Sequence, residues 1–388
     1  MSDPKSGEEW LVNGVLHGGD TGTVATLLRA TLTPLAWLHR LGLDVYLAPF
    51  RLGLRKRFRL PVPVVSIGNL SSGGTGKTPA TALVAGMLRD AGKRVVILSR
   101  GHGGTAARGS DPVVVSDGKG TRLPPDRAGD EPALLAALLP EVPVVVCRDR
   151  RKSGRLAVER FAPDVIVLDD GLQYWQLHRD LDIVLLDARR PFDNGYVLPR
   201  GLLREVPSHL SRAGIVILTR ADRVTDAATL AQTIAAVREH TAPGIPILTA
   251  THAPVGWVRA GVPDTILPLD ALPDRPAVVF SGIADGKAFA ETVTALGIRV
   301  HSVRSFGDHH DYTAKDVGAL REEAKENLLL TTEKDLVKVA AFGANASGVD
   351  ALPELYALRI ALRVSDEGVL SDALTSPSPS PQPPPSSE

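Results

Sequence analysis

The chain of 388 residues contains a single cysteine, Cys147, and carries no formal net charge at pH 7. One thiol cannot form an internal disulfide or a zinc cluster, so we expect an intracellular protein in which Cys147 packs as a small apolar residue. Zero net charge argues against a dedicated nucleic-acid-binding protein. The sequence also lacks the ~20 successive apolar residues of a membrane-spanning helix. Its first residues do not form a secretory signal.

Both ends of the chain are poor in core-forming residues. Residues 1–23 are polar and rich in glycine, and we expect them to form a flexible extension. Residues 371–388 are almost entirely proline and serine from Ser376 onward. Such a segment cannot bury an apolar core, so we expect a disordered tail.

Residues 24–60 differ from the flanking sequence in having regularly spaced leucines. The leucines at 28, 32, 35, 38 and 41 recur at spacings of three and four, which predicts an amphipathic helical segment. Pro34, Gly42 and Pro49 are expected to break this segment into short helices. Basic residues then cluster from Arg51 to Arg59 with no acidic residue among them.

The body of the chain alternates short apolar runs with helical patterns. The runs cover residues 62–67, 94–98, 142–146, 165–168, 183–186, 215–218, 245–249 and 277–280. Fully apolar strands that alternate with helices indicate an α/β fold, with a mostly parallel sheet flanked by helices. We expect a core over residues 61–255 and a smaller C-terminal α/β lobe over residues 256–370.

A glycine-rich loop with a lysine lies between the first predicted strand and the first helix of the core. Its residues are Ser71, Ser72, Gly73, Gly74, Thr75, Gly76, Lys77 and Thr78. In this context backbone N–H groups and the helix N-terminus surround a nucleotide phosphate, Lys77 reaches the β/γ-phosphates and Thr78 ligates Mg²⁺. The usual pattern begins with glycine, where this chain has Ser71. The loop predicts a P-loop NTPase-like core.

Three acidic clusters allow more than one interpretation. Asp169 and Asp170 end an apolar run, as the Mg²⁺-associated carboxylate of P-loop proteins does, and we favour this role over a simple helix cap. Asp130 and Glu131 open a helical segment, and by spacing alone they are helix caps. His309 lies within Asp308-His309-His310-Asp311. Three roles stay open for it: general base, metal ligand or surface residue. A zinc site is not expected, because no cysteine or further histidine has the spacing of zinc ligands.

Taken in order, these stretches resemble the tetraacyldisaccharide 4'-kinase family, the lipid A 4'-kinases of Gram-negative bacteria. The resemblance covers roughly residues 27–364. It is carried by Ile67-Gly68-Asn69, Gly73-Gly74-Thr75-Gly76-Lys77-Thr78-Pro79, Leu98-Ser99-Arg100-Gly101, Gly129-Asp130-Glu131-Pro132, Leu168-Asp169-Asp170-Gly171-Leu172-Gln173, Asp308-His309 and Thr332-Glu333-Lys334-Asp335. His102 departs from the family, which usually has tyrosine there. His310 directly follows His309, so which histidine pairs with Asp130 stays open.

The resemblance implies a reaction in which ATP phosphorylates the 4'-hydroxyl of an acylated glucosamine disaccharide. It implies a catalytic dyad of Asp130 and His309, with Asp130 as the base. Thr78, Glu131, Asp169 and Asp170 would organise Mg²⁺. The expected partners are the lipid substrate and the cytoplasmic face of the inner membrane, and no obligate protein partner is implied.

An acylated substrate gives the amphipathic segment a function, because such a lipid leaves a bilayer reluctantly. The residues expected to contact the membrane are Leu28, Leu32, Leu35, Trp37, Leu38, Leu41, Arg51 and Arg55. The alternative is that the leucines pack on the body and the arginines form a solvated linker. Two other functions compete with the lipid kinase: a P-loop switch or partitioning-type ATPase, and a membrane-docked structural protein with a degenerate nucleotide site.

Overall fold

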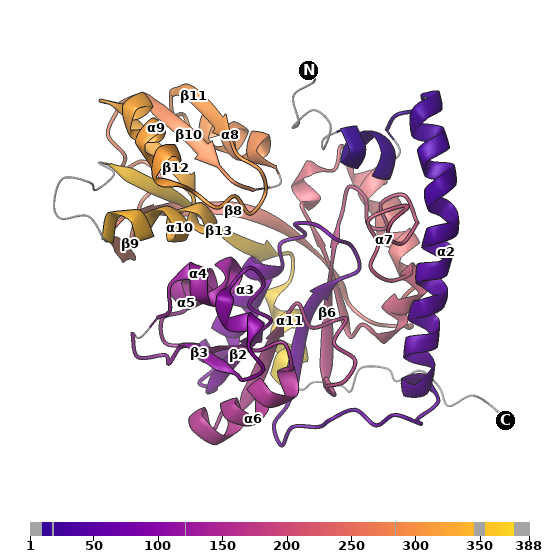
Figure 1. Cartoon of the computed structure of the whole chain (residues 1–388). Coiled ribbons are helices and arrows are strands. Elements are labelled where there is room, and N and C mark those ends of the chain that lie inside the picture. Colours follow the sequence, from indigo (N-terminus) through magenta and orange to yellow (C-terminus); the bar gives the residue numbers. More distant parts are fainter. Residues whose placement is uncertain (1–9, 18, 121, 284, 345–353, 376–388) are drawn as a thin grey trace. The chain divides into compact units, whose positions relative to one another are not determined.

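The computed structural model describes residues 10–17, 19–120, 122–283, 285–344 and 354–375 (Figure 1). These residues form two compact units. The first takes in the chain up to Leu98, Arg150–Thr251 and the chain from Leu362 onward. The second takes in Ser99–Asp149 and His252–Ala361. Each unit is therefore assembled from segments that are far apart in the sequence.

The first unit contains a parallel sheet with the strand order β2-β5-β1-β6-β7-β8. Its strands are β1 (Val64–Asn69), β2 (Val95–Ser99), β5 (Val165–Asp169), β6 (Leu181–Asp187), β7 (Ile215–Thr219) and the start of β8 (Ile247–Arg259). Every residue of β1 and β5 is buried, as their uninterrupted apolar sequences predict. The mostly parallel α/β fold is thus confirmed.

Helices accompany this sheet along the chain. They are η1 (Trp10–Leu16), α2 (Thr23–Arg51), α3 (Lys77–Asp90), α6 (Arg150–Phe161), η3 (Pro207–Arg212), η4 (Ala221–Arg223), α7 (Ala227–Arg238) and α11 (Glu367–Thr375). Side chains of α7 pack on β6 and β7 in one apolar cluster, which includes Val184, Val216 and Val237. Asp226 begins α7 by accepting a hydrogen bond from the Thr229 backbone N–H.

The second unit has a smaller parallel sheet, β11-β10-β12-β13, and antiparallel pairs β3–β4 and β8–β9. Its strands are β3 (Val113–Ser116), β4 (Val144–Val146), the end of β8, β9 (Val262–Leu267), β10 (Ala277–Ser281), β11 (Val300–Ser305), β12 (Leu328–Thr332) and β13 (Leu355–Val364). Its helices are η2 (Thr105–Arg108), α4 (Pro125–Ala128), α5 (Asp130–Leu138), α8 (Gly286–Ala295), α9 (Ala314–Ala324) and α10 (Glu333–Ala344).

The boundary between core and lobe differs from the expected division at residue 255. Residues 99–149 were assigned to the core, but they belong to the same unit as residues 252–361. The cause is packing of α5 against α10, together with contacts from Asp130 to His309 and Lys338. Order along the chain does not reveal such packing.

The N-terminal amphipathic segment is one unbroken helix, so the expected series of short helices is wrong (Figure 1). Pro34 and Pro49 lie inside α2. A proline inside a helix costs ~3 kcal/mol because it removes one hydrogen bond and clashes with the preceding turn. Burial of Ala25, Ala36, Leu47 and Phe50 contributes to the stability of this helix.

The two ends are more ordered than expected where the structure describes them. Residues 10–16 form the π-helix η1, which places Val15 in a fully buried position, so this part is not a flexible extension. Residues 371–375 belong to helix α11 and not to a disordered tail, while residues 1–9 and 376–388 lie outside the described residues. Within the described chain, no helix combines the length and apolarity needed to cross a membrane.

Candidate active site

The phosphate loop of the first unit joins β1 to α3, as the sequence predicts. Gly76 caps α3 with a φ of 85°, a left-handed conformation that glycine adopts without strain. Backbone N–H groups at the start of α3 have no partners within the helix, and the helix dipole adds positive potential there. Lys77 begins α3, and its ammonium group donates to Asn69 at the end of β1. The local geometry is that of an anion site.

Asn69, the last residue of β1, is hydrogen-bonded to residues of the phosphate loop. Its side-chain amide donates to Thr75 Oγ1 over 2.8 Å, and its amide oxygen accepts from Lys77 Nζ over 3.3 Å. Thr219 at the end of β7 donates to the Thr75 carbonyl over 3.1 Å. Asn69 is fully buried, so these contacts fix the loop and the position of Lys77. The sequence contained Asn69 in a matching stretch but gave no signal for this role.

Asp169 and Asp170 end β5 beside the phosphate loop. Asp169 is buried and accepts a hydrogen bond from Thr81 of α3 over 3.0 Å. Asp170 lies 3.9 Å from Lys77 Nζ, and both its oxygens accept from Arg204 at 3.0 Å. Burial alone would raise the pKa of Asp170, but the charges of Lys77 and Arg204 outweigh it and hold that pKa below its usual value. Asp170 is therefore ionised at neutral pH.

Two arginines of the first unit were not anticipated as neighbours of this loop. Arg204 binds Asp170 and also donates to Gln173 over 3.2 Å. Arg220 donates to Asp187 over 2.6 Å and to the Gly74 carbonyl over 2.5 Å. Arg220 directly follows β7, whereas Arg204 lies in the long connection between β6 and η3. No motif marks either residue in the sequence.

Asp130 and His309 meet in the second unit. Asp130 is the first residue of α5, and its Oδ2 lies 3.1 Å from His309 Nδ1 and 2.7 Å from Lys338 Nζ. Burial opposes ionisation of Asp130, but the hydrogen bonds and charges of His309 and Lys338 prevail and lower the pKa of this carboxyl. The structure thus provides a half-buried, ionised carboxylate held by two donors.

Close backbone packing fixes Asp130 at this place. Gly129 has a φ of 91°, and a Cβ atom there would lie 2.4 Å from the carbonyl oxygen of His102. Only glycine fits both the backbone conformation and this contact. The stretch that contains His102 therefore packs directly on the residue that precedes Asp130. The His102 ring also lies edge-on to the His309 ring, with 6.3 Å between centroids.

Lys334 and Lys338 contact opposite ends of the Asp130–His309 pair. Lys334 Nζ lies 3.3 Å from His309 Nε2 and 3.2 Å from Asp308 Oδ1. Lys338 is buried and also donates to the His310 carbonyl over 3.0 Å. A spacing of four residues places both lysines on one face of α10. This spacing is the signal by which the missed residue, Lys338, can be found in the sequence.

The stretch around Asp335 has a structural function in the second unit. Buried Asp335 accepts hydrogen bonds from Thr332 Oγ1, the Gly282 N–H and Tyr312 O–H at 2.7, 3.0 and 3.0 Å. Burial raises the pKa of Asp335. These contacts hold the loop that carries His309, whose N–H donates to the Gly282 carbonyl over 3.1 Å.

His310 occupies a different environment from His309. Its ring stacks on Phe306 with 4.7 Å between centroids, and its Nε2 lies 3.3 Å from Asp316. His309 is the histidine that contacts Asp130, with its backbone in the left-handed region at a φ of 58°. Of the two histidines, His309 is therefore the one that pairs with Asp130.

The expected Mg²⁺ residues are divided between the units. Thr78, Asp169 and Asp170 belong to the first unit, whereas Glu131 follows Asp130 on α5 in the second. Membership of Glu131 in one metal site with the others stays a prediction. Among the described residues, no group of three or more His, Cys, Asp or Glu side chains converges as a metal site.

The expected membrane-contacting residues of α2 are not equally accessible. Leu35, Trp37, Leu38 and Leu41 are exposed by 52%, 65%, 65% and 59%, whereas Leu28 and Leu32 are half-buried on the side toward the body. Leu27 and Val45 add exposed apolar surface that was not predicted. Leu27, Leu38 and Val45 follow at spacings of eleven and seven, which brings them to nearly the same side of an α-helix.

The two arginines predicted to join the membrane-contacting residues also differ in their surroundings. Arg51 is half-buried, donates to Asp44 over 3.3 Å and contacts His209. Arg55 is exposed, and its guanidinium lies over the ring of Phe50. Arg55 is therefore the more accessible of the two.

Comparison with known proteins adds an independent finding. A model of the tetraacyldisaccharide-1-P 4'-kinase family matches residues 28–377. The tetraacyldisaccharide 4'-kinase of Desulfatibacillum aliphaticivorans is 39% identical over 365 residues, which cover 92% of this chain and 93% of that protein. The protein of the same name from Geobacter sulfurreducens is 38% identical over 359 residues, which cover 92% and 96%.

A solved structure of similar fold is LpxK from Aquifex aeolicus in complex with ATP. The two chains superpose with a TM-score of 0.73 and 32% sequence identity. The match covers 90% of this chain and 99% of the Aquifex chain.

Proposed function

The chain belongs to the tetraacyldisaccharide-1-P 4'-kinase family. We propose that Asp130 and His309 conduct the proton transfer of the kinase reaction. We also propose that the enzyme acts at a membrane surface. Family membership confirms the resemblance and the kinase activity expected from the sequence. The chain is a tetraacyldisaccharide 4'-kinase of lipid A biosynthesis, and an acylated disaccharide is its substrate. The alternatives, a partitioning-type ATPase or a structural protein with a degenerate nucleotide site, lack comparable support.

The first unit supplies the nucleotide half of the reaction in this proposal. Residues 71–78 surround the phosphates of ATP, the nucleotide named for the Aquifex relative. Lys77, held by Asn69 and facing Asp170, neutralises charge on the transferred group. Its tethering supports this role, because phosphoryl transfer depends chiefly on positioning and electrostatic stabilisation.

Oxygen ligands beside this loop fit a hard cation. Thr78, Asp169 and Asp170 would hold Mg²⁺, and the low pKa of Asp170 keeps one ligand ionised. Such an ion neutralises phosphate charge when bound. Thr81 orients Asp169 through its hydroxyl, and Arg204 holds Asp170. Glu131 is proposed as a further acid toward the phosphate region.

The observation that carries the catalytic proposal is the pairing of Asp130 with His309 and Lys338. A sugar hydroxyl attacks phosphorus more readily when its proton is accepted as the new bond forms. Asp130 receives the proton of the 4'-hydroxyl on a carboxylate oxygen. His309 orients Asp130 and shares that proton, while Lys338 keeps the carboxylate ionised before the reaction.

The proposed membrane contact is made by helix α2. Its exposed side presents Leu27, Leu35, Leu38, Leu41 and Val45 without an intervening charge. A helix with one apolar side can lie in the boundary between headgroups and acyl chains. We place this contact at the cytoplasmic face of the inner membrane, where the acylated substrate is held.

The catalytic proposal is tested by comparing Asp130→Asn with wild-type protein. The assay measures transfer of label from ATP to a tetraacylated disaccharide 1-phosphate in detergent. Loss of a general base lowers turnover by ~10²–10⁴-fold. Binding of ATP should be retained, because Asp130 lies outside the phosphate loop. Asp126→Asn, which changes an exposed acid on the preceding helix α4, is the matched control.

Three outcomes would be informative, and the first of them would count against this assignment. Full turnover in Asp130→Asn would remove the carboxylate from catalysis. Equal loss of turnover and ATP binding would indicate a disrupted structure, which a thermal unfolding curve of the variant would show. Absence of any labelled lipid from folded wild-type protein would contradict the kinase activity itself.

A further inference from the structure

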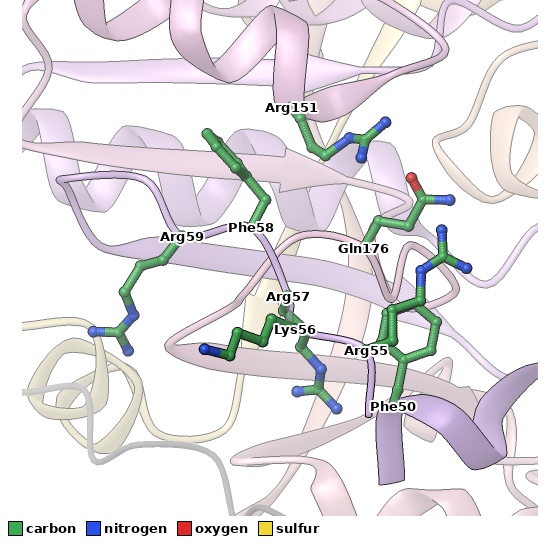
Figure 2. Close-up of a pocket in the computed structure, with 8 residues that line it drawn as sticks. All are labelled: Phe50, Arg55, Lys56, Arg57, Phe58, Arg59, Arg151 and Gln176. Carbon is green, nitrogen blue, oxygen red and sulfur yellow. The ribbon is translucent and has the colours of Figure 1, made fainter. Parts of the chain in front are cut away.

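A basic pocket in the first unit has no part in the reaction described above. It encloses about 380 Å³ where the chain leaves α2 and approaches β1. Its lining, shown in Figure 2, consists of Phe50, Arg55, Lys56, Arg57, Phe58, Arg59, Arg151 and Gln176. Arginine or lysine occupies most of these positions, and no carboxylate is among the described residues that line the pocket. This composition is that of an anion site.

The backbone beneath the pocket is fixed. The Phe58 N–H donates to the Gln176 carbonyl over 2.8 Å, and the His178 N–H donates to the Phe58 carbonyl over 2.8 Å. These bonds tie residues 57–59 to the segment that leads into β6. The basic side chains therefore extend from an ordered strand-like segment and not from a free linker.

Aromatic rings orient two of the guanidinium groups. Arg55 Cζ lies 5.0 Å from the ring centre of Phe50, and Arg57 Cζ lies 5.0 Å from that of Trp175. A guanidinium over a ring satisfies its flat face and leaves its N–H edge available to an acceptor. This edge fits two oxygens of one phosphate group.

Among the described residues, Arg57 forms no ion pair of its own, whereas the two arginines beside it do. Arg57 is half-buried near Arg179 and Arg212, whose guanidinium groups hydrogen-bond Asp182 and Glu205 over 2.7 and 2.9 Å. Burial lowers the pKa of Arg57, and the charge of Arg179 lowers it further. Asp182 opposes this shift, but it is the partner of Arg179. An anion in the pocket would stabilise Arg57 in its charged form.

The surroundings of the pocket identify the source of the anion. Leu52 and Leu54, between α2 and the basic segment, are exposed by 59% and 78%. In the chain they lie between the exposed leucines of α2 and the basic residues that line the pocket. An anion that carries acyl chains would contact both the basic pocket and the exposed leucines, whereas a soluble anion would contact the pocket alone.

We propose that this pocket binds the phosphate group of a bilayer phospholipid, a ligand other than the disaccharide that is phosphorylated. The inference rests on the proposed membrane contact of α2. The lipid phosphate accepts hydrogen bonds from Arg55 and Arg57, while Lys56 adds positive charge. Arg59 adds less, because its guanidinium lies 3.4 Å from Asp180 Oδ1. Bound headgroups would fix the depth and orientation of the enzyme on the membrane.

The test uses vesicles in which phosphate comes from one component only. Digalactosyldiacylglycerol vesicles receive either phosphatidylglycerol or an equal mole fraction of oleate, whose charge is a carboxylate. Wild-type protein should bind the phosphatidylglycerol vesicles more tightly. Arg57→Gln and Lys56→Gln should each reduce this preference roughly fivefold, the effect of one basic group near an anionic surface. Because Lys56 is exposed, its variant tests the site without disturbing packing.

Arg40→Gln is the matched control, since it removes an exposed charge from α2 outside the pocket. It should weaken binding to both kinds of vesicle alike and keep the preference. Equal binding of wild-type protein to both kinds of vesicle, or an unchanged preference in Arg57→Gln, would overturn the proposal. The proposal would also be wrong if inorganic phosphate occupied the pocket and phosphatidylglycerol did not compete with it.

Two further measurements separate this site from the proposed function. Dioctanoyl-phosphatidylglycerol below its micellar concentration should bind wild-type protein roughly fivefold more tightly than Arg57→Gln, and this binding requires no membrane contact by α2. Failure of vesicle binding alone would contradict the membrane contact, whereas failure with the short-chain lipid would contradict the pocket. The Michaelis constant for the disaccharide, measured in phospholipid-free detergent, should be unchanged in Lys56→Gln. A raised value would assign the pocket to the substrate's own phosphate and refute the proposal.

Discussion

Lys338 Nζ lies 2.7 Å from Asp130 Oδ2, on the carboxylate oxygen that also faces His309. The two residues are far apart in the sequence, yet α5 and α10 pack together and bring them into contact. Lys338 is nearly inaccessible to solvent, so its charge is poorly screened. Together with His309, it lowers the pKa of the proposed base against the opposing effect of burial.

Lys338→Met should move the acid limb of the kcat/KM profile to higher pH. Asp130 accepts a proton only when ionised, so activity falls as the pH drops through its pKa. Lys338 lowers that pKa against the opposing effect of burial, and its removal lets burial raise it. At pH values above the limb, the loss should be smaller than the ~10²–10⁴-fold expected for losing the base.

Lys315→Met, an exposed change on α9 of the same unit, should leave the profile unchanged. If Lys338→Met lowered the rate equally at every pH, Lys338 would act through structure and not through the pKa of Asp130. The measurement is a series of initial rates at saturating ATP across the pH range in which the protein stays folded.

Replacing each neighbouring histidine by asparagine should separate catalysis from stability. Asparagine tolerates the left-handed backbone at position 309, so His309→Asn should lower turnover with little change in the free energy of unfolding. His310 stacks on Phe306 and packs edge-on against Tyr312. Losing such aromatic contacts costs about 0.5–1.5 kcal/mol each, so His310→Asn should chiefly lower stability. Urea unfolding and single-turnover rates on both variants would show a reversed pattern if the assignment were wrong.

Thr81→Val should raise the Mg²⁺ concentration needed for half-maximal rate without changing any residue of the phosphate loop. The hydroxyl of Thr81 orients Asp169, and losing such a supporting hydrogen bond costs roughly 10–100-fold in metal affinity or activity. The measurement is the Mg²⁺ concentration that gives half-maximal rate, together with nucleotide binding in the presence and absence of Mg²⁺. Thr331→Val, a buried hydroxyl of the second unit that donates to the Phe280 carbonyl, is the control. An unchanged Mg²⁺ requirement in Thr81→Val would argue against Asp169 as a metal ligand.

The parts of the site that sequence reasoning could predict are local ones. The phosphate loop lies between a strand and a helix that follow each other, so its residue pattern also defines its geometry. Asp170 was predicted in the same way, as an acid at the end of an apolar strand. Asn69 and Thr81, which fix these groups, carry no signal of their own because their roles depend on neighbouring strands.

The second unit could not be predicted from spacing. Asp130 and His309 are 179 positions apart, and only the family resemblance paired them. By its position alone, Asp130 was a helix cap, and the segment from 99 to 149 was part of the core. Packing between α5 and α10 decides both matters, and it depends on side chains from distant segments. The same holds for α2, which continues through Pro34 and Pro49 and buries residues such as Ala36 and Leu47.

Leu38→Gln should weaken binding to neutral glycolipid vesicles by roughly tenfold or more, because an exposed leucine that enters the acyl boundary contributes about 1.5–3 kcal/mol. Leu38 is 65% exposed on the apolar side of α2, so its replacement should not destabilise the fold. His39→Gln changes the next exposed position without removing apolar surface and should bind as wild type does. Both variants should phosphorylate a detergent-solubilised substrate at the wild-type rate, whereas Leu38→Gln should be slower on substrate embedded in vesicles. Equal vesicle binding by Leu38→Gln and His39→Gln would show that this side of α2 does not meet the membrane.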